Sequence, residues 1–367
     1  MKIGLIGFST RNYIPYIEYY ENIFKSNNIS YECIFWDRFN NDNTKKKSNE
    51  YTIHVVCKPG MNKLRKIFPM YKFKMELERI IEKEQYTHLV VLTTVPGVLI
   101  WKKLLAGFKN KYILDIRDYS YEKYSWYRKI VEQLIANSYF TAISSNGFKT
   151  FLPQSDKIIT CHNIGNKFSE EKEIGDLKNK EKIIIGFVGG VRYFDENCKF
   201  IQIFANNPKY QLYYIGKRNL DCDLEGYCKR NNIKNVVFKG DFNNADKPEI
   251  YKKIDFINSV YGNKSLEVTT ALPNRLYDGI LFKKPIIASE GTYLGEVVDE
   301  YGLGIVVDID ASIKLTLEQF DGYVKNLDRE RLKKHCESFK KIVFNEQDIF
   351  VKKINNFIQT KRVQCKR

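Results

Sequence analysis

The chain has 367 residues, of which 43% are hydrophobic and 28% are charged, a composition typical of a folded protein with two domains. The eight cysteines stand singly and the four histidines do not cluster with them, which argues against a disulfide framework or a structural zinc site. The longest apolar stretch, residues 89–101, is shorter than the roughly 20 residues that a membrane span needs, and the first ten residues do not resemble a signal peptide. We therefore expect a cytoplasmic protein with reduced thiols.

The charge is strongly positive and unevenly distributed. Lys and Arg number 60 against 44 Asp and Glu, which gives a net charge of +16. Residues 1–165 alone carry 25 basic and 15 acidic side chains. Such a surface attracts phosphates, whether of nucleic acid, anionic lipid or a phosphorylated substrate, and charge alone does not choose among them.

Strands and helices alternate in the first half of the chain, which predicts a parallel, doubly wound sheet. The expected strands are residues 2–7, 31–36, 51–57, 88–93, 111–115, 139–144 and 157–160. The expected helices are residues 15–27, 73–84, 98–106 and 127–137. The polar segment 166–182 has no apolar periodicity and is expected to be an interdomain linker.

The alternation starts again after this linker. The expected strands are residues 183–188, 211–215, 236–238, 256–259, 285–288 and 304–307. The expected helices are residues 224–231, 248–254, 273–282, 294–300, 315–325 and 328–356. The fold class is therefore α/β, with an N-terminal Rossmann-like domain over 1–165 and a C-terminal one over 183–340, facing each other across a cleft that suits a ligand.

The strongest motif lies in residues 271–308. Pro273 suits a first helical turn, and the unpaired N–H groups of such a turn can bind a diphosphate. Asn274 and Asp278 are four residues apart and so share one helix face. The carboxylate of Asp278 could accept hydrogen bonds from both hydroxyl groups of a ribose.

This motif resembles the large retaining glycosyltransferase family with the two-domain GT-B architecture, a family 4-like group, particularly its bacterial capsule and cell-wall members. That family has a helix with an acidic residue, then Gly-x-Pro, an apolar strand and a glycine-containing loop. The corresponding residues here are Leu276-Tyr277-Asp278-Gly279 and then Lys283-Lys284-Pro285-Ile286-Ile287-Ala288-Ser289. The resemblance covers most of residues 183–310 and, more faintly, residues 1–165.

Two positions depart from the family pattern. Lys283–Lys284 stands where the family usually has glycine before Pro285. Thr270 stands eight positions before Asp278, where family members often carry a second Glu, so the sugar contact of that Glu is in question. Glu267 lies nearby and is a candidate substitute.

The resemblance implies a retaining, metal-independent hexosyltransferase that uses a nucleotide sugar, with a UDP-sugar favoured, and needs no cofactor. The acceptor would be a saccharide or a lipid-linked saccharide of surface polysaccharide synthesis. The resemblance also implies that the C-terminal helix, residues 341–367, crosses back to the first domain. The residues expected to bind the donor are Gly190, Gly216, Asp241, Thr270, Leu272, Asn274 and Asp278.

A basic pair is expected in the loop after strand 183–188. In the resembled family this pair neutralises the donor diphosphate, which gains negative charge as the glycosidic bond breaks. Arg192 and Lys199 are the candidates, and ordinary surface positions are the alternative, more so for Lys199. Gly216 and Gly240–Asp241 each end a strand, where the backbone could approach a nucleotide closely.

The acceptor side is expected at strand ends of the first half. Residues 114–118 resemble the family's strand-end motif, which makes Asp118 a candidate catalytic base or sugar contact. Arg117 could bind a phosphate, or it could form an internal Arg–Asp pair that fixes the loop. The loop after the first strand adds Ser9, Thr10 and Arg11 as acceptor-side candidates.

Two short segments are ambiguous. Residues 63–74 interleave five basic side chains with apolar ones, which suits an anionic membrane surface as well as a solvated loop, and Pro69 argues against one unbroken helix. Asp221-Cys222-Asp223 matches the DxD metal motif of the other main glycosyltransferase fold, but three-residue matches are common by chance and we assign no metal site.

Two other functions compete with sugar transfer. A nucleotide-sugar 2-epimerase would share the architecture, but it would need carboxylates and histidines in the cleft, and only His162 falls near a strand end. A non-enzymatic polyanion-binding protein would explain the charge, but no nucleic-acid recognition motif occurs, so no nucleic-acid partner is expected.

Overall fold

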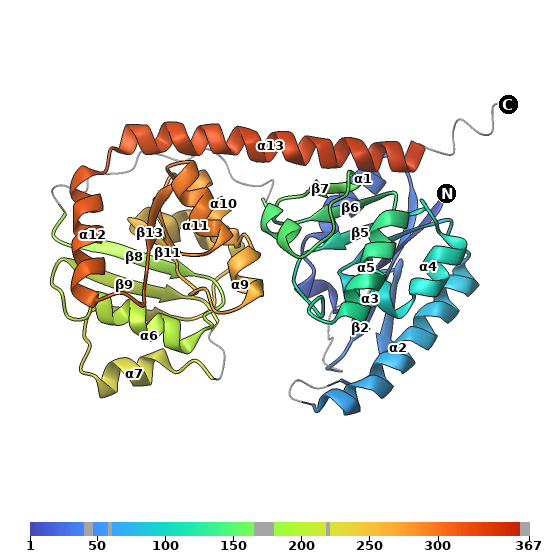
Figure 1. Ribbon diagram of the computed structural model, residues 1–367, viewed down its shortest axis with the longest axis horizontal. Coiled ribbons are helices and arrows are strands. Elements are labelled where there is room, and N and C mark those ends of the chain that lie inside the picture. Colours follow the sequence, from blue (N-terminus) through green and yellow to red (C-terminus); the bar gives the residue numbers. More distant parts are fainter. Residues whose placement is uncertain (40–46, 58–60, 165–179, 218–220, 360–367) are drawn as a thin grey trace. The chain divides into compact units, whose positions relative to one another are not determined.

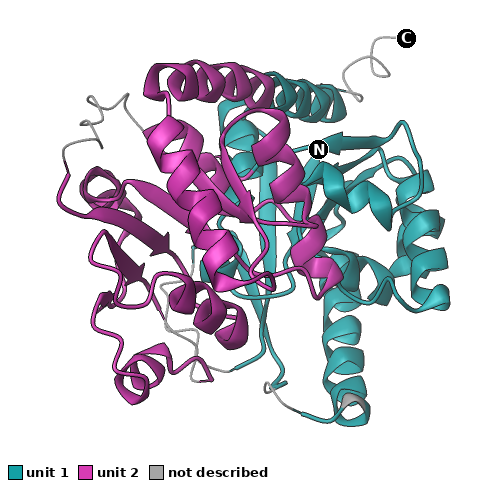
Figure 2. Cartoon of the chain, turned by 60° about the vertical axis from the view of Figure 1, so that its left-hand side comes forward, with its two compact units in different colours: residues 1–162, 345–367 teal, residues 163–344 magenta. Residues whose placement is uncertain are grey.

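The computed structural model describes residues 1–39, 47–57, 61–164, 180–217 and 221–359 (Figure 1). The chain divides into two compact units (Figure 2): residues 1–162 together with 345–367, and residues 163–344. Most of the expected linker, 166–182, lies outside the described residues. No helix among the described residues is long and apolar enough to cross a membrane.

The first unit is built on a seven-stranded parallel sheet with the strand order β3-β2-β1-β4-β5-β6-β7. Its strands are β1 (Lys2–Ile6), β2 (Ser30–Asp37), β3 (Glu50–His54), β4 (His88–Leu92), β5 (Tyr112–Ile116), β6 (Phe140–Ile143) and β7 (Ile158–Thr160). Its complete helices are α1 (Ile17–Ser26), α2 (Lys63–Glu84), α3 (Thr94–Leu99), α4 (Trp101–Gly107) and α5 (Ser125–Asn137). Because helices cover both faces of a parallel sheet, the central strands β4 and β5 are apolar and wholly buried.

The end of the C-terminal helix α13 (Arg329–Gln359) belongs to the core of this first unit. Phe350, Ile354 and Phe357 of α13 pack with α1 against side chains of the central strands. Glu346 is hydrogen-bonded to the ring of His162. Burial acts to raise the pKa of Glu346, but the hydrogen bond and charge of His162 outweigh it and hold that pKa below its usual range.

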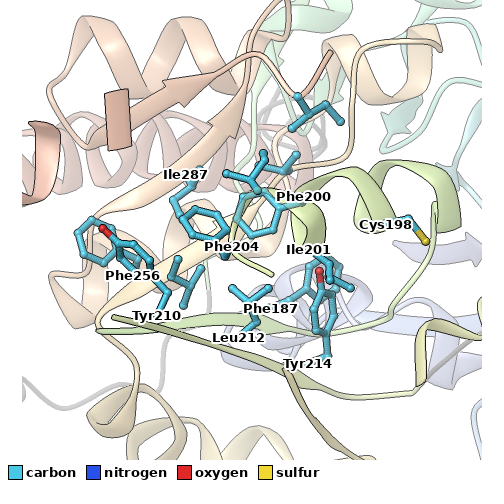
Figure 3. Close-up of a cluster of buried hydrophobic side chains, with 14 of the residues drawn as sticks. Phe187, Cys198, Phe200, Ile201, Phe204, Tyr210, Leu212, Tyr214, Phe256 and Ile287 are labelled. Carbon is cyan, nitrogen blue, oxygen red and sulfur yellow. The ribbon is translucent and has the colours of Figure 1, made fainter. Parts of the chain in front are cut away.

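The second unit is built on a six-stranded parallel sheet with the strand order β10-β9-β8-β11-β12-β13. Its strands are β8 (Ile183–Val188), β9 (Tyr210–Ile215), β10 (Val236–Lys239), β11 (Phe256–Ser259), β12 (Ile286–Ser289) and β13 (Gly304–Val307). Its helices are α6 (Phe194–Ile203), α7 (Leu224–Arg230), α8 (Lys247–Lys253), α9 (Leu266–Thr270), α10 (Asn274–Phe282), α11 (Tyr293–Glu300), α12 (Ile313–Asn326) and the start of α13. Its main core is rich in aromatic side chains from β8, β9, β11 and α6, among them Phe187, Tyr214 and Phe256 (Figure 3).

Both sheets reverse their strand order beside their first strand, at β1–β4 and at β8–β11. At such a point the connections leave the sheet in opposite directions, which opens a crevice outside the carboxyl ends of the strands. The loops that follow β1, β2, β4 and β5 in the first unit, and β8 to β11 in the second, are therefore the places to search for a site.

The structure corrects three expectations about helices. The prediction that Pro69 interrupts its segment was wrong, because α2 runs unbroken from Lys63 to Glu84, with Asn62 capping its first turn. The expected helix 98–106 is two helices that meet at Ile100. Helix α6 was not predicted, because it begins directly after Tyr193 in a left-handed conformation and has no capping side chain at its start.

Candidate functional site

A glycine loop follows β8 at the carboxyl edge of the second sheet. Gly216, after β9, has φ +133°, and a Cβ on it would lie 2.2 Å from the carbonyl oxygen of Gly189, so the two backbones are in direct contact. The amide of Asn197 donates hydrogen bonds to the carbonyls of Arg192 and Tyr193. These contacts fix the loop in a conformation that leaves Gly190 and Arg192 exposed.

Arg275 is a buried cation beside this loop. It lies in the first turn of α10 and is 3% exposed. Its guanidinium carbon lies 3.6 Å from the ring centroid of Phe187 and 4.5 Å from that of Tyr261. Its Nη1 donates to the carbonyl oxygen of Asn258 at 2.7 Å. Within the described residues no carboxylate forms an ion pair with it, and Asp278, the carboxylate whose charge favours its protonated form, is itself paired with Lys247.

Burial therefore makes the protonated form of Arg275 less favourable than it is in water. Burial lowers the pKa of Arg275 to about 9. The charge of Arg192 acts in the same direction, and the carboxylate of Asp278 offsets only part of the effect. Arg192 also has no carboxylate partner in the described part of the chain. Two unneutralised cations beside the N-terminus of α10 make a site suited to a phosphate or diphosphate.

Lys199, the predicted partner of Arg192, is placed differently. It lies in the middle of α6, and its ammonium forms an ion pair with Asp310 after β13. Arg275 is the second cation that the structure brings beside Arg192, and sequence reasoning missed it. Its position in the first helical turn after Pro273 was a usable signal, but in the sequence it reads as an ordinary polar residue of an amphipathic helix.

Asp278, the predicted ribose contact, is buried and already paired. The ammonium of Lys247 donates to Oδ1 at 2.8 Å and to Oδ2 at 2.9 Å, and the hydroxyl of Tyr251 donates to Oδ2 at 2.8 Å. A carboxylate has about four lone-pair sites, so about one is left for a ribose hydroxyl. Lys247 and Tyr251 were not predicted, because nothing in the sequence connects α8 with α10.

The remaining donor-side candidates differ in accessibility. Asn274 is exposed at the start of α10, and Pro273 caps this helix in an extended conformation instead of lying within the first turn. Asp241 lies at the end of β10 and lines a cavity of 250 Å³ with side chains of β9 and α8. The hydroxyl of Thr270 donates to Leu266 within α9, and Leu272 is part of a hydrophobic cluster.

At the carboxyl edge of the first sheet, Arg117 is buried and engaged internally. Its Nε and Nη2 donate to the two carboxylate oxygens of Asp115 at 2.5 and 2.9 Å, and its Nη1 donates to the carbonyl of Cys161 at 2.8 Å. This geometry favours the interpretation of Arg117 as an internal pair that fixes the loop over the interpretation as a phosphate contact.

The other acceptor-side candidates lie at the same edge. Arg11 forms ion pairs with Glu21 and Glu50, so its charge is also matched within the unit. Thr10 is buried, Ser9 is partly exposed, and Asp118 is exposed just beyond β5.

No group of three or more His, Cys, Asp or Glu side chains that could hold a metal ion occurs among the described residues. In the DxD-like segment, Asp223 accepts a hydrogen bond from the backbone N–H of Gly226 at 2.9 Å. This aspartate therefore caps the start of α7.

No protein-family model and no curated protein sequence matches the chain. Its structure is similar to that of a sucrose-phosphate synthase from Thermosynechococcus elongatus, with a TM-score of 0.72 and 12% identity over 99% of this chain and 100% of the other. It is also similar to the apo form of the lipopolysaccharide outer core galactosyltransferase WaaB, with a TM-score of 0.66 and 15% identity over 98% and 100%.

A third similar structure contains UDP and glucose. HepE of Anabaena, in complex with UDP and glucose, has a TM-score of 0.66 and 11% identity over 97% of this chain and 100% of the other. At these identities the likeness establishes the fold. The chain therefore has the α/β fold of the GT-B glycosyltransferases, with two Rossmann-like units.

Proposed function

We propose that this protein is a glycosyltransferase that transfers a hexose from a nucleoside diphosphate donor to a saccharide acceptor. The observation that carries the proposal is the pair Arg192 and Arg275, two cations that form no ion pair with a carboxylate in the described chain and lie beside a glycine loop and a helix N-terminus. The donor diphosphate is the ligand that would match this charge. The fold shared with glycosyltransferases supports the proposal.

The same residues would lower the barrier to sugar transfer. The diphosphate gains negative charge as the bond to the anomeric carbon breaks, and fixed donors around the developing charge stabilise the transition state. Losing one such donor typically reduces the rate by about 10²–10³-fold. Retention of the anomeric configuration without a metal ion belongs to the proposal and rests on the family resemblance alone. Asp118 is proposed as the residue facing the acceptor.

The donor base is proposed to be uracil, since a similar structure holds UDP. Calorimetric titration of the purified protein with UDP, GDP and ADP tests the proposal. We expect UDP to bind at least tenfold more tightly than GDP or ADP. Selective binding of another nucleotide would change the base, whereas no binding of any of the three would overturn the proposed function.

The acceptor is proposed to be lipid-linked, and α2 offers a surface for this. Five of its apolar side chains are 48–75% exposed: Leu64, Ile67, Phe68, Tyr71 and Met75. A groove of 650 Å³ runs between α2 and β3, lined by Phe68, Tyr71 and Met75. Basic side chains of the same helix, such as Arg65 and Lys72, are also exposed. An apolar stripe flanked by positive charge is complementary to an anionic membrane surface.

Vesicle flotation tests this membrane contact. We expect the protein to bind vesicles that contain phosphatidylglycerol and not those of phosphatidylcholine alone. The double substitution Ile67→Ser and Phe68→Ser should reduce binding at least fivefold, because it removes two exposed apolar anchors at about 0.8 kcal/mol per CH₂ no longer buried. Leu315→Ser, an equally exposed apolar position in α12, is the matched control. Equal loss in both variants would contradict the assignment to α2.

A further inference from the structure

Arg38, at the carboxyl edge of the first sheet, is a cation that has no carboxylate partner within the described residues. It follows β2 directly, and its guanidinium lies 5.2 Å from the ring centroid of Phe8 and 5.8 Å from that of Trp36. Its Nε is enclosed by protein atoms and has no hydrogen-bond partner within the described residues. Aromatic rings attract a cation through their faces, but they do not replace the hydrogen-bond acceptors that a guanidinium loses on burial.

The three arginines of this edge, Arg11, Arg38 and Arg117, differ in whether a carboxylate pairs with them. Arg11 is paired with Glu21 and Glu50, and Arg117 is paired with Asp115. Arg38 has no carboxylate partner in the part of the chain that the structure describes. Burial lowers the pKa of Arg38, as expected for a cation that has lost water without gaining an anion.

Beyond the rings of Phe8, Trp36 and Phe39, which the guanidinium contacts, two tyrosines with exposed side chains lie near Arg38. Tyr13, which is 64% exposed, and Tyr121, which is 38% exposed, are close enough for their phenol groups to influence its titration. Tyr121 is held in place by an edge contact with Tyr127, at 5.6 Å between centroids. Exposed aromatic faces next to a buried donor are the usual components of a site for a ring-shaped polar ligand.

Thr93, at the end of β4 on the same edge, is strained. Its backbone has φ 74° and ψ 163°, a region that is essentially reserved for glycine, and its hydroxyl is buried without a partner among the described residues. A β-branched residue held in this conformation costs about 1–3 kcal/mol, and such residues concentrate at ligand sites. The edge therefore holds a second unsatisfied hydrogen-bonding group besides Arg38.

We infer that this edge of the first unit binds an acceptor saccharide that carries an anionic group, phosphate or carboxylate. The guanidinium of Arg38 takes the anionic group, and the sugar ring packs against Tyr13 and Tyr121. A planar guanidinium matches both groups because it can donate two parallel hydrogen bonds. The inference rests on the proposed function, since it names the acceptor of that reaction.

Competition with the donor site has to be excluded in the test, because a sugar phosphate could also bind at Arg192 and Arg275. The protein is therefore first saturated with UDP, and the UDP titration itself reports on the donor site. Glucose 6-phosphate, glucuronate and glucose are then titrated calorimetrically. We expect one of the two anionic sugars to bind at least tenfold more tightly than glucose, and their order distinguishes phosphate from carboxylate.

Arg38→Gln should reduce the affinity for the preferred anionic sugar by about 10–100-fold, the usual contribution of a hydrogen bond to a charged group, and should leave the affinity for UDP unchanged. Arg38→Lys should recover part of it. Arg128→Gln, at an exposed arginine of α5 paired with Glu132, is the control and should change nothing. If UDP binds but glucose binds as tightly as both anionic sugars, or if Arg38→Gln has no effect, the inference fails while the proposed function stands.

Discussion

Replacing Arg275 with Gln is expected to weaken UDP binding by about 10–100-fold without destabilising the protein. The loss follows from removing a charge-assisted hydrogen bond to a phosphate, about 1.5–3 kcal/mol. Stability should change little, because the lost contacts with Phe187, Tyr261 and the Asn258 carbonyl are offset by removing a buried cation that has no ion pair within the described residues. Calorimetry with UDP and thermal unfolding of the same samples measure the two effects.

Two further variants sharpen this test. Arg275→Lys keeps the charge but loses the planar geometry and should recover part of the affinity. Lys199→Gln removes a cation that is paired with Asp310 and should change UDP affinity less than twofold. A large fall in stability of Arg275→Gln with normal UDP binding would show that Arg275 only supports the fold.

The affinity for UDP should also depend on pH through the protonation of Arg275. Burial lowers the pKa of Arg275 to about 9, so the free protein loses about half of this charge near that pH and the rest above it. Bound phosphates favour the protonated guanidinium, so binding takes up a proton there and the affinity for UDP falls as the pH rises further. The uracil ring of UDP also loses a proton in this pH range. The pH profile of Arg275→Gln shows the contribution of uracil alone, so the difference from the unsubstituted protein gives the contribution of the guanidinium.

Replacing Gly216 with Ala is expected to destabilise the protein by about 3 kcal/mol or more and to abolish UDP binding. A Cβ at this position would lie 2.2 Å from the carbonyl oxygen of Gly189, a backbone atom that cannot rotate away, and φ at Gly216 is +133°. Relief of the clash requires the loop that carries Gly190 and Arg192 to move. Denaturant unfolding and UDP titration check the two parts of the prediction.

Gly240→Ala provides the matched control for this substitution. Gly240 also follows a strand of the second sheet, but a Cβ there would meet no atom within 4 Å. A change below about 0.5 kcal/mol is expected, as for most surface substitutions. Equal effects of the two variants would contradict the claim that the contact between Gly216 and Gly189 shapes the loop.

The sequence predicts the fold well because most strands of a buried parallel sheet are mainly apolar, and each of the thirteen strands in the described residues overlaps an expected one. It fails where local signals are weak or misleading. Pro69 is tolerated inside α2, which costs the helix one hydrogen bond, and α6 starts after Tyr193 in a left-handed conformation without a capping side chain.

The site is less predictable than the fold, because pairing between distant residues decides which charges are available. Arg11, Arg117 and Lys199 are conspicuous in the sequence, yet each has its charge matched by a carboxylate. Arg38 and Arg275 are inconspicuous in the sequence, yet neither is paired with a carboxylate in the described chain, and burial lowers the pKa of both. A one-dimensional pattern places a residue at a strand end or helix start, but only the folded structure shows which carboxylate lies opposite it.

Hydrogen exchange followed by mass spectrometry, with and without saturating UDP, tests the central claim most directly. UDP bound at the proposed donor site should slow exchange in three segments of the second unit: residues 187–193, 258–262 and 274–278. Exchange in segments 7–13 and 117–122 of the first unit should not be slowed, because these segments are not expected to contact the diphosphate. Protection confined to those first-unit segments, or no protection at UDP concentrations that saturate binding, would contradict the assignment of Arg192 and Arg275 to the diphosphate.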